Sequence, residues 1–366
     1  MASANPNTNL MGIIQEPRRE AVLKDRSTFR ESTPLRPDGW QRWSGATRRI
    51  RMDTGTILYH SLLCSLSFCP PEWGFGIAKH LGRTKFELMG KKREPLRREM
   101  EVGLGTTREE SVKHATRVSE LALWEDLESY FYSHIDRGSI ERLIQIRGLE
   151  NLDTALLRGK GAILCTGHIR GLFIFIIALS LMGYKVNVIR RAPRRVQGPV
   201  GRWFNRRMTL IDSGRCNYLW MHENNLGVAV QAGNALRRQE LVIVLIDARF
   251  GSETQTVHFL QHVLPLPTGH IVMAQACAVP LINFFVRTPE AGLPRIAELA
   301  EPYYPTTDVA AAVQYCVSTL ERNIRRSPAD WMWYPEREVW STPVQASLPP
   351  NGKKLTPGQN CDQEES

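Results

Sequence analysis

The chain has 366 residues, of which 42% are hydrophobic and 23% charged, and its formal net charge is +10. That length accommodates one large α/β domain with appendages, or two domains. The apolar content is sufficient for a hydrophobic core without metal or disulfide staples. The excess of positive charge indicates an anionic partner, whether nucleic acid, anionic membrane, phosphorylated lipid or acidic protein.

The cysteines and the first residues bear on the cellular environment. Seven cysteines are present, an odd number without C-x-x-C spacing, which is typical of a reducing, cytosolic setting. No spacing of His, Cys and Asp predicts a metal site, and we expect no cofactor. The segment MASANPNTNL lacks the apolar core of a cleavable signal peptide, and GTILYHSLLCSLSF is too short to predict a spanning helix.

Four regions are expected in chain order. Residues 1–54 predict a disordered or loosely attached arm, 55–145 a helical region that can contact a membrane, 146–341 an α/β domain and 342–366 a disordered tail. In the helical region, LYHSLLCSL and EESVKHATRVSELALWEDLESYFY have helical periodicity. Thr106 or Thr107 with Glu109 or Glu110 gives the second helix a start signal. The basic stretch KKREPLRREM between them is expected to be solvated.

The α/β region alternates strands with helices. IQIRGLENL predicts a strand and turn, DTALLRGK a helix, GAILCTGH a buried strand, GLFIFIIALSLMGY an apolar helix and KVNVIRR a strand. The order continues with a helix over 199–212, the helix NLGVAVQAGNALRRQE, the buried strand LVIVLIDAR and the helix GHIVMAQACA. It ends with the strands VPLINFFVRT and AELAEP and the helix DVAAAVQYCVSTLERNIRRSP. This pattern predicts a mixed central β-sheet flanked by helices.

Two polar side chains follow buried strands. His168 comes just after the strand that ends near Cys165, and ligands in open α/β sheets bind beyond the carboxyl ends of strands. A histidine there can take a proton from a substrate hydroxyl or amine; the alternative is a histidine that caps the next helix. Asp247 ends a second strand, where it can act in the site or form a structural pair with Arg249.

The charge is concentrated around His168. Between Asp153 and Asp212 there is no acidic residue and eleven basic ones: Arg158, Lys160, Arg170, Lys185, Arg190, Arg191, Arg194, Arg195, Arg202, Arg206 and Arg207. Arginine binds phosphate oxygens in pairs, so this window predicts an anion site near Arg190 and Arg191. A solvated basic face that attracts anionic lipid is the alternative.

Nucleic acid is the rival anionic partner. RRAPRRVQGPVGRWFNRR interleaves arginines with Trp203 and Phe204, which suits stacking and phosphate contacts. No zinc spacing, helix-turn-helix signature or RNP-like motif accompanies it, so we do not expect nucleic acid to be the partner.

We expect several other residues to have structural roles. Cys165 is expected to be a buried, inert cysteine rather than a thiol nucleophile. His262 and His270 flank the Pro-rich LPLPTG and are interpreted as loop histidines. Trp331 and Trp333 alternate as in a strand and are expected to cover the core or face an interface.

Five blocks, in order from about residue 85 to 341, resemble one family. The five blocks are GLENLDTALLRGKGAILCTGH, VNVIRR, LVIVLIDAR, VHFLQHVLPLPTGHIVMAQACAVPLINFFVR and SPADWMWYPEREVW. They are similar to segments of bacterial lysophospholipid acyltransferases of the lipid A late acyltransferase (lauroyl/myristoyl, HtrB-like) type. The resemblance implies a glycerolipid acyltransferase-like α/β fold at the cytoplasmic face of the inner membrane, peripheral or weakly anchored. It also implies acyl transfer from acyl carrier protein or acyl-CoA, as co-substrate, to an anionic lipid acceptor at the membrane surface.

The resemblance also assigns residues. His168 matches the histidine of an H-x4-D/E motif and would be the general base, with Asp247 in the aspartate block. Arg190 or Arg191 would bind phosphate, and Gly269 matches the glycine before the later helix. We expect Arg170 and Arg249 to contribute to substrate binding as well.

One position departs from the family motif. Where the motif has its acid, this chain has Phe173, which cannot orient or stabilise an imidazolium. Three alternatives follow: catalysis with His168 alone or with Asp247 as substitute, acyl transfer to a specialised metabolite, or lipid binding without turnover.

Overall fold

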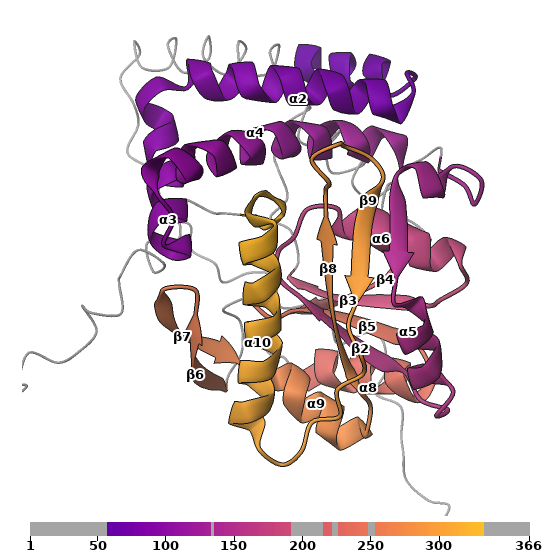
Figure 1. Cartoon of the computed structure of the whole chain (residues 1–366). Coiled ribbons are helices and arrows are strands. Elements are labelled where there is room, and N and C mark those ends of the chain that lie inside the picture. Colours follow the sequence, from indigo (N-terminus) through magenta and orange to yellow (C-terminus); the bar gives the residue numbers. More distant parts are fainter. Residues whose placement is uncertain (1–56, 133–134, 192–214, 222–225, 248–252, 333–366) are drawn as a thin grey trace, which may run out of the picture. The chain divides into compact units, whose positions relative to one another are not determined.

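A mixed β-sheet lies at the centre of the structure (Figure 1). The computed structural model describes residues 57–132, 135–191, 215–221, 226–247 and 253–332, all within one compact unit. The strands of the sheet are β1 (Ile144–Arg147), β2 (Ala162–Thr166), β3 (Val186–Arg191), β4 (Asn217–Met221), β5 (Leu241–Leu245), β8 (Leu281–Arg287) and β9 (Arg295–Leu299). Among the described residues this is a seven-stranded sheet in the order β1-β9-β8-β2-β5-β3-β4.

Strand direction makes the sheet mixed. Strands β8, β2, β5, β3 and β4 run parallel, β9 pairs antiparallel with β8, and β1 pairs parallel with β9. The central strand β2 is buried along its whole length, as expected for a parallel strand covered on both faces. The sequence-based prediction of a mixed central sheet flanked by helices is confirmed.

Helices alternate with the strands, and one follows the last strand. They are α5 (Leu149–Leu156), α6 (Leu172–Leu181), α8 (Leu226–Arg237), α9 (Gly269–Cys277) and α10 (Val309–Arg326). Helices α8, α9 and α10 contact one another in succession, and α10 packs against β8. Gly148 fixes the start of α5: its φ of +77° is left-handed, and a Cβ there would lie 2.3 Å from the Leu299 carbonyl oxygen. The helix therefore begins earlier than the predicted DTALLRGK.

The N-terminal region is helical, as predicted. It contains a helix over residues 57–66, α2 (Pro71–Leu88), α3 (Glu94–Leu104) and α4 (Arg108–Phe131). Thr107 and Glu110 form the capping box at the start of α4. Helix α2 packs along α4 (Figure 1), and Gly82 permits the close approach because a Cβ there would lie 2.5 Å from the Glu120 Cα. No helix in the described part of the chain combines the length and apolar composition that a membrane span requires.

The structure refines one local prediction, adds one strand and leaves one predicted helix untested. KKREPLRREM is largely solvent-accessible, as expected, but it is helical. It forms a 3-10 turn (Gly90–Arg93) and most of α3, where Met100 is buried and Arg97 is paired with Glu94 and Glu101. Strand β4 was missed because its short, partly exposed segment has no strong alternation. The predicted helix over 199–212 lies outside the described residues.

A separate hairpin was also missed. Strands β6 (Thr254–Phe259) and β7 (His262–Pro267) pair antiparallel in a two-stranded sheet, and β6 contacts α10. The prolines at 265 and 267 argued against a strand, but a two-stranded sheet tolerates them because both of its strands are edges. His262 is therefore a buried residue of β7, and His270 a buried residue of α9, rather than loop histidines.

Candidate active site at the carboxyl end of the sheet

Sheet pairing brings His168 and Asp247 together. Strands β2 and β5 are parallel neighbours, with Thr166 in register with Leu245, and the Ile246 N–H donates to the Thr166 carbonyl at 2.8 Å. His168 lies two residues after β2, and Asp247 lies two residues after β5. Because parallel neighbours end at the same edge, residues 79 apart in the sequence become adjacent.

Two contacts join His168 to Asp247. The His168 Nδ1 lies 2.7 Å from Asp247 Oδ1, and the His168 backbone N–H donates to Asp247 Oδ2 at 2.9 Å. Gly167 makes this approach possible, since a Cβ on it would lie 2.9 Å from Asp247 Oδ2. Ring and backbone are thus both anchored on one carboxylate, which fixes the orientation of the imidazole.

A third group holds the carboxylate from the other side. The Trp331 indole N–H donates to Asp247 Oδ2 at 2.8 Å, and Trp331 is 2% exposed. Backbone pairing aligns the two segments: Ile169 forms an antiparallel bridge with Trp331, and the Met332 N–H donates to the His168 carbonyl at 2.7 Å. The sequence indicated only that Trp331 covers the core, and Trp333 lies outside the described residues.

The electrostatics keep Asp247 ionised. Its burial raises the carboxyl pKa, but the His168 charge and the hydrogen bonds from His168 and Trp331 outweigh burial, so the pKa of Asp247 lies below its ordinary value. An ionised carboxylate only accepts hydrogen bonds, so His168 Nδ1 is the donor in this contact. The His168 side chain is 27% exposed, whereas that of Asp247 is fully buried.

Arg170 points into the protein. The residue is buried; its Nη1 lies 2.7 Å from Glu125 Oε2 on α4, and its Nε donates to the Ala329 carbonyl at 3.2 Å. Its backbone N–H donates to the Asp330 carbonyl at 2.7 Å. These contacts tie the segment after His168 to α4 and to the segment that carries Trp331.

A buried ionic network supports the same segment. Arg295 on β9 lies 2.8 Å from Glu128 on α4 and 3.6 Å from Asp330, and all three are at most 1% exposed. Asp330 also accepts hydrogen bonds from the Thr288 backbone and hydroxyl, at 2.9 and 2.7 Å. The residue before Trp331 is therefore held at several points in the core.

The other predicted substrate-binding residues are dispersed. Arg190, near the end of β3, lies over the rings of Phe173 and Tyr218, with centroid distances of 5.8 and 5.3 Å. Arg190 thus shares the carboxyl edge of the sheet with His168, and its guanidinium lies over the ring of Phe173. The Arg191 side chain and Arg249 lie outside the described residues, and Gly269 is the exposed first residue of α9.

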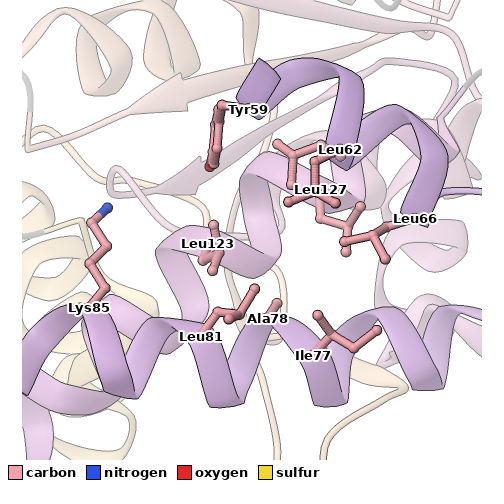
Figure 2. Close-up of a pocket in the computed structure, with 10 residues that line it drawn as sticks. Tyr59, Leu62, Leu66, Ile77, Ala78, Leu81, Lys85, Leu123 and Leu127 are labelled. Atoms are coloured by element: carbon pink, nitrogen blue, oxygen red, sulfur yellow. The ribbon is translucent and has the colours of Figure 1, made fainter. Parts of the chain in front are cut away.

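An apolar pocket lies in the helical region (Figure 2). It has a volume of about 420 Å³ and lies between the helix over 57–66, α2 and α4. Leucines dominate its wall, and Lys85 stands at one end of it (Figure 2). The lining residues are Tyr59, Leu62, Leu63, Leu66, Ile77, Ala78, Leu81, Lys85, Leu123 and Leu127. This volume is within the range of small-molecule pockets, and the lining suits a hydrocarbon chain.

Comparison with known proteins identifies a related family. The model of the family described as bacterial lipid A biosynthesis acyltransferase matches residues 46–337, which is more than half of the chain. No curated protein matches the chain significantly. The matched range includes His168, Asp247 and Trp331.

Proposed function

Because the chain belongs to the bacterial lipid A biosynthesis acyltransferase family, we propose that it transfers a fatty acyl group from a thioester, acyl carrier protein or acyl-CoA, to an anionic lipid acceptor, with His168 as general base. Membership of the family indicates acyl transfer. The observation that supports the base is the 2.7 Å contact of His168 with a buried, ionised carboxylate.

The proposed chemistry uses both nitrogens of the ring. His168 Nε2 takes the proton of the acceptor hydroxyl or amine while that oxygen or nitrogen attacks the thioester carbonyl. The tetrahedral intermediate then collapses, the C–S bond breaks, and the imidazolium returns the proton to the leaving thiolate. Asp247 stabilises the imidazolium and holds it in one orientation, as the acid of a catalytic triad does.

Asp247 supplies the function that the resemblance assigns to position 173. Phe173 cannot accept a hydrogen bond, whereas Asp247 accepts from both the ring and the backbone of His168. The departure from the motif is therefore compatible with turnover, and we favour catalysis over lipid binding without turnover.

The acceptor and the membrane are proposed from charge and exposed apolar surface. Arg190 places positive charge on the same edge of the sheet as His168, which suits a lipid phosphate. Ile57, Leu58, Phe68 and Trp73 are each more than half exposed. These apolar side chains suit peripheral contact with the cytoplasmic face of the inner membrane, with basic residues attracting anionic lipid.

The test is a turnover assay of the full-length protein. Wild type and His168→Ala are incubated with lysophospholipid or lipid A precursor and with acyl carrier protein or CoA thioesters, and products are identified by mass spectrometry. We expect His168→Ala to lose roughly 10²- to 10⁴-fold in kcat. His80→Ala, at an exposed position on α2, is the matched control and should retain activity. Equal rates for wild type and His168→Ala would remove the ring from the mechanism, and lipid binding without product would favour the non-enzymatic alternative.

A further inference from the structure

Two thiols and an imidazole from distant parts of the sequence meet in the core. Cys165 on β2, His270 on α9 and Cys316 on α10 each offer a ligand atom, and these atoms lie within 4.8 Å of one another. The two cysteines are 0% exposed and the histidine 5%. The residues are 105 and 46 positions apart along the chain, so sequence spacing gave no sign of the cluster.

Three rigid elements fix the cluster. Cys165 and Gly167 are two residues apart on or just after β2 and so face the same side. The Cys316 and Leu320 side chains, one turn apart on α10, face that side, because Leu320 lies 3.0 Å from the position of a Cβ on Gly167 and Cys316 neighbours Cys165. Helix α9 brings His270 against α10. Ligands held by a strand and two helices need little reorganisation to bind an ion.

One polar group of the cluster points to a missing ligand, and an amide lies beside it. Within the part of the chain that the structure describes, His270 Nε2 and the Asn283 side-chain nitrogen are buried and have no hydrogen-bond partner. Asn283 lies in register with Cys165 on the neighbouring parallel strand β8, so the two side chains share a face. The Cys316 sulfur interacts with the side chains of Cys165, His270 and Asn283, although its contacts with His270 Nε2 and the Asn283 nitrogen do not meet hydrogen-bond geometry. Buried polar atoms without partners are rare, and an unplaced ion is one of their ordinary explanations.

We propose that Cys165, His270 and Cys316 bind one structural Zn²⁺ ion, with the Asn283 side chain adjacent to the fourth position. Tetrahedral zinc with Zn–S bonds of about 2.3 Å and Zn–N bonds of about 2.0 Å separates its ligand atoms by roughly 3.5–3.8 Å, within the spacing observed. Zinc displaces the two thiol protons, which leave to solvent. Two thiolates, a neutral imidazole and Zn²⁺ then have no net charge, which suits a fully buried site.

The net charge of the buried site also favours zinc over copper. Thiolate and imidazole ligands suit Zn²⁺ and Cu⁺, but Cu⁺ with two thiolates would leave a buried negative charge. A disulfide between Cys165 and Cys316 would leave His270 Nε2 without a partner. The zinc ion would tie α9 and α10 to β2 three residues before His168. The zinc proposal does not depend on the proposed function, because its evidence is separate from the His168 contacts.

The first test is the metal content of the full-length protein. Protein expressed in zinc-supplemented medium and purified without chelators is expected to contain one zinc per chain by elemental analysis. Cys165→Ala/Cys316→Ala, which replaces both thiols with small apolar groups suited to the core, should contain none. Cys277→Ala, in the last turn of α9 and outside the cluster, is the matched control and should retain the ion. Zinc retained by the double variant would place the ion elsewhere and overturn the site.

A second measurement keeps the proposal testable if the double variant does not fold. Wild type is stripped with a chelator under reducing conditions and titrated with Co²⁺, Zn²⁺ or Cu⁺. We expect thiolate-to-cobalt absorption that saturates at one equivalent, displacement of Co²⁺ by Zn²⁺, and a rise in the unfolding temperature with zinc. No metal at purification together with no cobalt absorption, a Cys165–Cys316 disulfide in the peptide map, or stoichiometric copper in place of zinc would each contradict the proposal.

Discussion

Replacing Asp247 by asparagine tests the pair at the centre of the site. The substitution removes one negative charge and nearly preserves the shape of the side chain. Asp247 Oδ1 lies 2.7 Å from His168 Nδ1, and the Asp247 side chain is fully buried. With charge centres about 4 Å apart and an effective dielectric constant of about 20, the imidazolium and carboxylate attract by about 4 kcal/mol. Each 1.36 kcal/mol changes a rate tenfold, so we expect kcat to fall roughly 10³-fold.

The assay separates orientation from general damage. Initial rates with a saturating acyl thioester and varied lipid acceptor give kcat and KM for wild type, Asp247→Asn, His168→Ala and the double variant. If Asp247 acts through His168, the double variant is no slower than His168→Ala, because the second change removes nothing further. Asp308→Asn is the matched control: Asp308 caps α10 through the Ala311 N–H, and asparagine caps equally well.

Two results would refute this reasoning. A loss of less than about tenfold in kcat for Asp247→Asn would show that the carboxylate does not stabilise a charged ring, given the size expected of such pairs. A double variant slower than His168→Ala by a further large factor would show that Asp247 acts independently of the ring. In either case another group would have to supply the function of the motif acid.

Three further predictions concern the surroundings of the pair. Trp331→Phe keeps an aromatic ring but removes the N–H that donates to Asp247. A hydrogen bond to a charged group contributes about 1.5 kcal/mol, so kcat should fall about tenfold. The control Trp73→Phe, at a 70% exposed position, should leave the rate unchanged. Arg295→Met leaves buried carboxylates without their partner and should reduce the free energy of unfolding in urea by about 3–5 kcal/mol. Arg142→Met breaks an exposed pair and should cost at most about 1 kcal/mol, so equal losses would contradict the buried network. Because the pKa of Asp247 is lowered on folding, its ionisation stabilises the native state above the ordinary value of 3.8 and stops doing so as the pH falls through the lower, folded value. The difference in urea midpoint between wild type and Asp247→Asn should therefore be constant near neutrality and shrink in that acid range, and a difference that grows on acidification would reverse the assigned direction.

The interior of the site connects these predictions. Trp331, Asp330 and Ala329 lie in one short segment, and each contacts a different part of the core: Asp247, Arg295 and Arg170. We therefore expect substitutions in this segment to change orientation of the His168 ring as well as stability. For Arg170, the contacts favour a positioning role over the expected substrate contact, although its effect on substrate binding stays a prediction.

The sequence by itself determined the features that depend on local pattern. Runs of β-branched and apolar residues located β2, β5 and β8, and glycines marked the ends of α5 and α6. Thr106 or Thr107 with Glu109 or Glu110 marked the start of α4, and the structure selects Thr107 and Glu110. The position of His168 just beyond a buried strand followed from the same pattern, and so did the resemblance to the family that matches the chain. These features are readable because each depends on residues a few positions apart.

Only the tertiary structure decided which strand ends meet. Nothing in the periodicity of β2 or β5 says that they are neighbours, because strand order is set by how helices pack across the whole sheet and not by either segment. That order places Asp247 beside His168 and brings Trp331 onto the same carboxylate. It also turns Arg170 inward and gathers Cys165, His270 and Cys316, whose separation in the sequence concealed them.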